Sequence, residues 1–249
     1  MDKIQWFDEK YYKLTLNDKT LYLPSSTTML GLIIRPWLLN WYGDIGTETA
    51  KYRSEKAKQL GSHIHELAKR LFEGETLKAE DYKQEAWVQV HRIQQWYEAF
   101  KPEILLTEHT VYSLEHLFAG TLDLCIALAG GKYDTGYNKP IELPAGKYIL
   151  DLKTGKGLDS LYNYQLASYK VAHEEMTKEK ITGTLILHTQ ATTKKGWKVL
   201  YRNEQEMNKD FELFLHIADV WKEENKDLTP DIFDMPAEIR LFEKEKEAL

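Results

Sequence analysis

An aspartate and a lysine lie two residues apart in the run YILDLKTG, as Asp151 and Lys153. In a strand such residues point to the same face, so a carboxylate and an ammonium would lie side by side. Cleaving a phosphodiester needs a divalent cation, which neutralises the phosphate and activates water, and a positive group that stabilises the charge developing during attack. Asp151 suits the first task and Lys153 the second, although a salt bridge at a strand end would also explain the pair.

A second aspartate, Asp123 in GTLDL, follows the dipeptide Ala119-Gly120, for which a tight turn is expected. Pairing of its strand with the strand of Asp151 would bring two carboxylates together. Carboxylates placed in this way repel each other unless a cation binds between them. The two aspartates therefore predict a site for a divalent cation.

A helical histidine is a candidate for a further ligand. His65 lies in GSHIHEL, one turn after Gly61, and a mid-helix glycine costs about 1 kcal/mol relative to alanine. We therefore expect Gly61 to leave room for a substrate beside the imidazole. The competing interpretation is a histidine satisfied at the surface or in the core. His63 lies on another face of this helix and is not expected in the site.

Two polar residues of QLASY, Gln165 and Tyr169, are i and i+4 on a predicted helix and would point the same way. They are candidate site residues, and the polar rim of an amphipathic helix is the alternative. Glu108 begins a predicted strand, and we expect it to pair with a basic residue rather than to assist a metal.

The elements that must position these residues follow from the apolar periodicity. Helices are predicted within 25–40 after a Ser/Thr cap, and over 54–73, 86–100 (ended by Pro102), 159–176 and 207–221. Strands are predicted over 108–114, 118–128, 148–153, 182–189 and 197–202, with a loop over 129–147. The first three strands should form a meander. This order predicts an α/β fold, a mixed central β-sheet flanked by helices.

The chain of 249 residues, 43% hydrophobic, is long enough for one large domain. We expect a single domain over 1–249, with a mainly helical N-terminal part (1–105), a catalytic sheet core (106–204) and C-terminal helices (205–249). The single cysteine, Cys125, excludes a disulfide framework and a four-cysteine iron–sulfur cluster. No apolar run approaches the roughly 20 residues of a membrane span, and no signal peptide begins the chain, so we expect a cytoplasmic protein without a membrane partner.

Together these motifs resemble the RecB-type branch of the PD-(D/E)XK nucleases, whose ordered pattern is G-x-x-x-H, G-x-x-D, D/E-x-K and Q-x-x-x-Y. Here the four motifs are Gly61 to His65, Gly120 to Asp123, Asp151 to Lys153, and Gln165 to Tyr169. The segment PSSTTMLGLIIRPWLLNW, residues 24–41, is similar to a signature of phage exonucleases and of the mitochondrial genome maintenance exonuclease. It departs from that signature at Ser26, where valine is usual, and at Arg35, where lysine is usual.

The resemblance implies a restriction-endonuclease-like core with Mg²⁺ or Mn²⁺ as cofactor. His65, Asp123, Asp151 and the backbone carbonyl of Leu152 would ligate one or two ions, and Lys153 would orient the attacking water. Gln165 and Tyr169 would hold the site and the DNA. Hard oxygen ligands suit Mg²⁺, and an added imidazole makes Mn²⁺ more welcome.

The segment 24–41 supplies candidate DNA contacts. Hydroxyls of Ser25, Thr27 and Thr28 could donate to phosphate, and Trp37 or Trp41 could stack on an unpaired base. A helix cap and core packing are the alternative roles. The net charge of −6 argues against bulk electrostatic binding of nucleic acid, so phosphate contact would be confined to a local stripe of Lys51, Arg53, Lys56 and Lys58.

The expected function is therefore hydrolysis of DNA phosphodiester bonds by an exonuclease that acts on DNA ends or single strands and leaves 5′-phosphates. A structure-selective endonuclease on duplex or branched DNA would share every motif. A non-catalytic DNA-end-binding module is a third possibility, against which the complete set of His65, Asp123, Asp151 and Lys153 argues. The sequence leaves the oligomeric state and the choice between DNA and RNA open.

Overall fold

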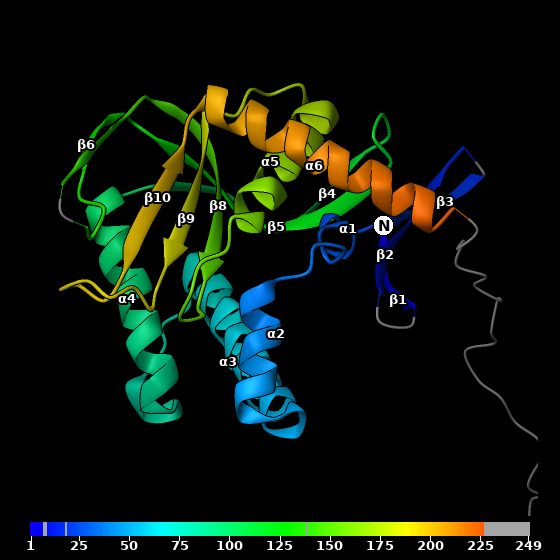
Figure 1. Ribbon diagram of the computed structural model, residues 1–249. Helices are drawn as coiled ribbons and strands as arrows, with labels where there is room; N and C mark the ends of the chain where they lie inside the picture. The colour runs from blue at the N-terminus through cyan, green and yellow to red at the C-terminus, as the bar shows by residue number, and fades with distance from the viewer. Residues whose placement is uncertain (7–8, 18, 138, 227–249) are drawn as a thin grey trace, which may run out of the picture.

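A five-stranded mixed sheet forms the centre of the computed structural model, which describes residues 1–6, 9–17, 19–137 and 139–226 (Figure 1). Its strand order is β10-β9-β8-β5-β4. The strands are β4 (Glu103–Ser113), β5 (Phe118–Leu128), β8 (Gly146–Lys153), β9 (Gly183–His188) and β10 (Lys198–Arg202). β4, β5 and β8 form an antiparallel meander, and β8 and β9 run parallel. The predicted mixed sheet and meander are confirmed.

Helices cover both faces of this sheet. On one face, α3 (Thr47–Phe72) and α4 (Gln84–Phe100) enclose a core that includes Ile64, Trp96 and Leu150. On the other face lie α5 (Leu161–Thr177), which makes the crossover from β8 to β9, and α6 (Glu204–Glu224). This arrangement places the first turns of α5 beside the end of β8, where Lys153 lies.

A second, three-stranded antiparallel sheet precedes the helices. It consists of β1 (Asp2–Trp6), β2 (Glu9–Leu16) and β3 (Lys19–Pro24) in the order β1-β2-β3. The expectation of a mainly helical residue range 1–105 omitted it. The sequence does carry a signal for a strand that ends in a turn, because apolar and polar residues alternate in KLTL and an asparagine follows them. In the structure Asn17 has a φ of 47°, a turn conformation that asparagine tolerates.

The helix expected within 25–40 is divided into α1 (Ser26–Leu30) and α2 (Pro36–Ile45). Pro36 explains the restart, since its fixed φ and missing N–H suit the first position of a helix. The loop expected over 129–147 contains a small hairpin, β6 (Gly131–Tyr133) and β7 (Ile141–Leu143), and a 3-10 turn, η1 (Ala79–Asp81), precedes α4. Most of the range 205–249 beyond α6 lies outside the described residues.

None of the helices in the described part of the chain is both long enough and apolar enough to span a membrane.

Candidate active site

Asp123 lies where β5 and β8 separate. The ladder between these strands ends at the pair Leu124–Leu150, so Asp123 and Asp151 are the next residues facing each other. Instead of a backbone bond at this point, the N–H of Leu152 donates a hydrogen bond to Asp123 Oδ2 at 2.7 Å. The prediction that strand pairing brings the two aspartates together is therefore supported by the register.

Asp151 and Lys153 form an ion pair at the end of β8, with Nζ 2.7 Å from Oδ2. The Lys153 ammonium also lies 4.2 Å from the centre of the Tyr162 ring on α5. The strand end is held in place by Thr189, whose N–H donates to the carbonyl of Lys153 at 2.9 Å. Both side chains are largely buried, so the pair is a restrained feature of the sheet end and not a mobile surface contact.

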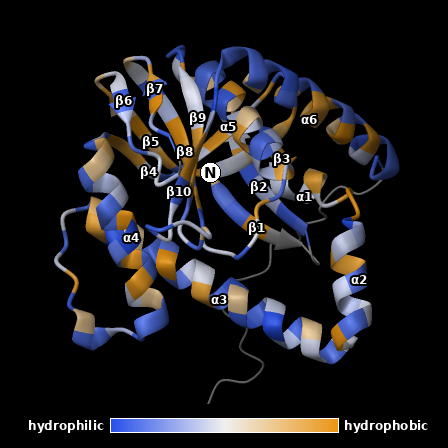
Figure 2. Cartoon of the chain, turned by 60° about the vertical axis from the view of Figure 1, so that its left-hand side comes forward, coloured by the Kyte–Doolittle hydropathy of each residue, from blue (hydrophilic) through white to orange (hydrophobic). Residues whose placement is uncertain are grey.

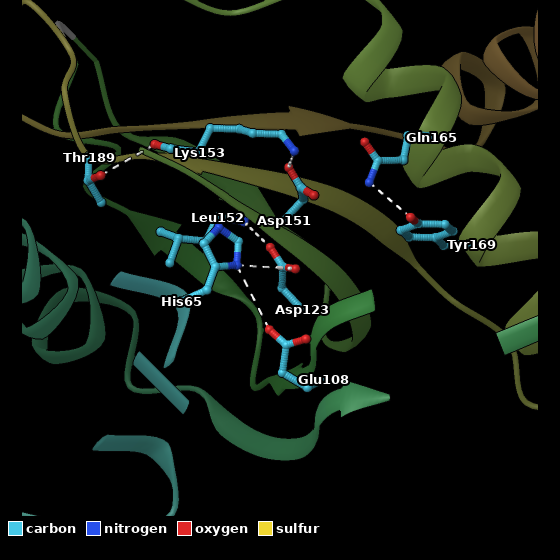
Figure 3. Close-up of polar contacts among 9 residues, drawn as sticks. All are labelled: His65, Glu108, Asp123, Asp151, Leu152, Lys153, Gln165, Tyr169 and Thr189. Atoms are coloured by element: carbon cyan, nitrogen blue, oxygen red, sulfur yellow. Dashed lines mark hydrogen bonds and ion pairs between the residues drawn. The ribbon is translucent and has the colours of Figure 1, made fainter. Parts of the chain in front are cut away.

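His65 reaches the same place from α3 (Figure 3). Its Nδ1 lies 3.5 Å from Asp123 Oδ1 and 3.8 Å from Glu108 Oε1. His63 is more exposed and faces Glu66 of its own helix, as expected for a residue on another face. At Gly61 a Cβ would lie 3.0 Å from Thr154 Oγ1, so the glycine lets α3 approach the residue that follows β8. The expected room for a substrate beside the imidazole stays a prediction.

Glu108 faces a base, His65, as expected, and it also belongs to the group that could hold a metal ion. Its neighbours Thr107 and His109 pair with Leu124 and Leu122, which places Glu108 opposite Asp123. Its φ is 46°, a left-handed conformation that is uncommon for glutamate within a strand and characteristic of functional sites. Sequence patterning misses such a residue, because alternation along a strand does not reveal a local reversal of φ.

Ligand atoms of His65, Glu108 and Asp123 lie within 4.8 Å of one another. One imidazole nitrogen and two carboxylate oxygens are donors that Mg²⁺ and, more readily, Mn²⁺ accept. Asp151, which is ion-paired with Lys153, lies outside this set of three, so its role as a ligand remains a prediction. The carbonyl of Leu152 likewise remains a predicted ligand.

The electrostatics of the group fit a cation. Burial lowers the pKa of His65, but the hydrogen bond and charge of Asp123, together with Glu108 and Asp151, raise it to about 10. Burial acts to raise the pKa of Asp123, and His65 and Lys153 more than offset it, so that pKa is lowered. Burial and the charge of Asp123 raise the pKa of Asp151 to about 6 despite Lys153. The group thus carries excess negative charge that a proton or a divalent cation can balance.

Gln165 and Tyr169 lie on one face of α5, as predicted, and the Gln165 amide donates to the Tyr169 hydroxyl at 3.0 Å. The tight turn expected at Ala119-Gly120 is wrong, because both residues lie within β5. A Cβ on Gly120 would lie 2.1 Å from Tyr169 Cε1. The glycine of G-x-x-D and the tyrosine of Q-x-x-x-Y are thus in packing contact, because the buried ring of Tyr169 occupies the space that Gly120 leaves.

The hydroxyls proposed to contact DNA have partners within the chain. Ser25 caps α1 by accepting from the N–H of Thr28 at 3.0 Å, and its hydroxyl lies 2.9 Å from that of Thr27. Only Thr27 of these three is exposed. Trp37 is 61% exposed, whereas Trp41 is half-buried and packs edge-on against Tyr42. Thr27 and Trp37 remain the more accessible candidates.

No family model matches the chain, and no curated protein matches it either. Among solved structures, one match is a crystal structure named "Putative exonuclease" from Eubacterium rectale. It is 13% identical, with a TM-score of 0.40, and the match covers 76% of this chain and 76% of that chain.

Proposed function

We propose that the protein is a divalent-metal-dependent nuclease of the PD-(D/E)XK type, RecB-like branch, that hydrolyses DNA phosphodiester bonds. The observation that carries the proposal is the convergence of His65, Glu108 and Asp123 within 4.8 Å beside the ion pair of Asp151 and Lys153. Three carboxylates, one imidazole and one restrained ammonium at the end of a sheet supply both the cation ligands and the positive group that phosphodiester hydrolysis requires.

Each side chain has a defined task in this proposal. A bound Mg²⁺ or Mn²⁺ ion would neutralise phosphate charge and lower the pKa of a bound water. His65, Glu108 and Asp123 would hold the ion, with Asp151 and the Leu152 carbonyl completing the ligand set.

Lys153 would orient the attacking water and stabilise the charge that develops on the phosphate. The Tyr162 ring below the ammonium and the Asp151 carboxylate beside it restrict its position before substrate arrives. Tyr169 would keep α5 in place against β5 through its contact with Gly120, and Gln165 would orient the Tyr169 hydroxyl by its hydrogen bond.

Single-stranded DNA is the substrate that the surface of α2 and α3 favours. Figure 2 shows α2 meeting the start of α3 at a corner, and α2 has no buried residue (Figures 1 and 2). Trp37 on α2 and Tyr52 on α3, which is 69% exposed, offer rings on which bases can stack. The exposed cations of α3 that could contact phosphates are Lys51, Arg53, Lys56 and Lys58.

The preference for DNA ends and for 5′-phosphate products comes from the resemblance of residues 24–41 to exonucleases. A structure-selective endonuclease remains the alternative enzyme. A non-catalytic DNA-end-binding module is less consistent with the site, because binding alone does not need the buried pairing of Asp151 with Lys153.

Parallel digestion of 5′-labelled, 3′-labelled and circular single strands tests the proposal. With Mn²⁺ or Mg²⁺ the linear strands should be degraded and the circle spared, and a chelator should stop cleavage. Cleavage of the circle would instead establish an endonuclease. Binding of DNA without cleavage in either metal would leave the binding module, and neither binding nor cleavage would reject the proposal.

A further inference from the structure

Lys10 of β2 lies near the candidate active site, although nothing in the sequence pattern singled it out. Its neighbour Tyr12 is fully buried and its hydroxyl lies 2.9 Å from Thr121 Oγ1 on β5. Thr121 and Asp123 are alternate residues of β5, and Lys10 and Tyr12 are alternate residues of β2, so each pair shares a face of its strand. The Lys10 ammonium lies 5.4 Å from the centre of the Tyr12 ring. The N-terminal sheet thus directs a cation toward the side of β5 that holds the carboxylates.

The backbone of Lys10 is fixed by the segment whose hydroxyls were expected to contact DNA. The Lys10 N–H donates to Thr28 Oγ1 at 3.0 Å, and the Lys10 carbonyl accepts from the N–H of Ser25 at 2.8 Å. The Thr28 hydroxyl also donates to this carbonyl, at 3.2 Å. Ser25 in turn bridges to Ala119 of β5. These contacts give Ser25 and Thr28 a positioning role: they connect Lys10 to the strand that carries Asp123.

The charges of Glu108 and Asp123 act on the Lys10 ammonium without a direct ion pair. Among the described residues, no carboxylate lies within the 4.0 Å of a direct ion pair with its ammonium. Glu108 and Asp123 are nevertheless near enough to raise its pKa, against a larger lowering by burial. A partly buried ammonium is stabilised when an anion is added beside it. A phosphate that contacts a cation held by Glu108 and Asp123 would supply such an anion.

We propose that Lys10 binds a non-bridging oxygen of the substrate phosphate that occupies the space beside the His65–Glu108–Asp123 group. This inference rests on the proposed nuclease function. Lys153 cannot do this work alone, because its ammonium is already paired with Asp151. Lys10 would supply a second cation from the other side. The charges then balance, since three carboxylates and one phosphodiester anion meet one divalent cation and two ammonium groups.

The test compares Lys10→Gln and Lys10→Arg with Lys13→Gln, a lysine of the same strand whose side chain lies on the opposite face. A 5′-fluorescein-labelled single strand is titrated in Ca²⁺, and anisotropy is followed as salt is varied. Lys10→Gln should weaken binding about ten-fold and lower the salt slope by about 0.7, the value for one lost contact with a single strand. Lys10→Arg and Lys13→Gln should bind like the native chain. In Mn²⁺, kcat/KM of Lys10→Gln should fall at least about ten-fold, with the melting temperature of each variant measured alongside.

The outcomes separate this inference from the proposed function. If the native chain cleaves DNA and Lys10→Gln retains the native affinity, salt slope and kcat/KM, Lys10 does not contact phosphate and only this inference fails. If the native chain neither binds nor cleaves DNA, the proposed function fails and this inference fails with it. If Lys10→Gln is less stable than the native chain, the salt slope of Lys10→Met at a temperature where it is fully folded decides: an unchanged slope overturns the assignment, and a lowered slope supports it.

Discussion

The Asp123 carboxylate accepts a hydrogen bond from the backbone N–H of Leu152, 2.7 Å from its Oδ2, at the point where β5 and β8 separate. Its other oxygen, Oδ1, faces His65 at 3.5 Å. One side chain therefore both holds the end of β8 and contributes to the candidate metal group. Asp151 differs, because its own contact is with Lys153, two residues along the same strand.

This difference predicts opposite effects of removing the two charges in metal-free buffer. The pKa of Asp123 is lowered and that of Asp151 is raised, so ionisation is favourable in the fold for the first and unfavourable for the second. Asp123→Asn should therefore lower the free energy of unfolding by about 1–3 kcal/mol, whereas Asp151→Asn should leave it unchanged or raise it. Thermal unfolding with a chelator present measures both. Equal destabilisation by the two variants would contradict this account, and both variants should bind Mn²⁺ more weakly than the native chain.

Lys153→Ala should abolish cleavage with little loss of DNA affinity. The ammonium is proposed to stabilise charge that develops only during attack, so turnover should fall by about 100-fold or more. Single-turnover cleavage and anisotropy measure the two effects separately. Lys147→Ala is the matched control, because Lys147 lies on the same strand but pairs with Glu179 away from the site. Native turnover in Lys153→Ala would remove this lysine from the mechanism.

Much of the site followed from residue spacing because its members lie on regular elements. The register of an antiparallel pair brings Asp123 opposite Asp151, and the alternation of a strand places Lys153 beside Asp151. The periodicity of α3 separates His65 from His63. Each of these relationships is a local consequence of a helix or strand that the sequence predicts.

The missed features depend on contacts between distant segments or on unusual backbone. Glu108 enters the group through a left-handed conformation that no alternation rule predicts. A turn was expected at Gly120. A glycine is needed there because the ring of Tyr169, from a helix later in the chain, occupies the place of a Cβ. Lys10 belongs to a sheet that was not predicted, and its proximity to Asp123 is a property of how that sheet packs on β5.

Gly120→Ala should disrupt the packing of the Tyr169 ring of α5 against β5, next to the candidate site. A Cβ at this position would lie 2.1 Å from Tyr169 Cε1, so the ring must move and its hydrogen bond with Gln165 must change. We expect a loss of about 1–3 kcal/mol in the free energy of unfolding, as for other overpacked positions. Gly43→Ala in α2 is the control, since nothing lies within 4 Å of its added Cβ and alanine favours a helix. A Gly120→Ala protein as stable as the native chain would show that the packing contact has no energetic importance.

The two tryptophans of α2 should differ in their effect on DNA binding. Trp37 is 61% exposed, whereas Trp41 is half-buried against Tyr42. Trp37→Ala should therefore weaken binding of a single strand by about 1–3 kcal/mol, the usual value of stacking on one base. Trp41→Ala should affect stability more than affinity. Anisotropy in Ca²⁺ and thermal unfolding distinguish the two effects, and a stronger loss of affinity in Trp41→Ala would reverse the assignment.

The pH dependence of metal binding should be set by the proton on His65. A ligating imidazole must be neutral, and the surrounding carboxylates, chiefly Asp123, overcome the effect of burial and raise the pKa of His65 to about 10 in the metal-free protein. A cation must therefore displace a proton throughout the neutral range, so Mn²⁺ affinity should rise with pH by up to about ten-fold per unit from this group, well above the ordinary histidine pKa of about 6.5. The same shift stabilises the metal-free fold fully below about pH 6.5 and ceases to do so as the pH rises through about 10, because the folded state alone holds the proton in that window. Calorimetric titration with Mn²⁺ over roughly pH 6 to 8 measures the slope. His65→Ala should bind more weakly and flatten it, His63→Ala should keep the native slope, and an affinity that is level above about pH 6.5 would show that His65 carries no proton for the metal to displace.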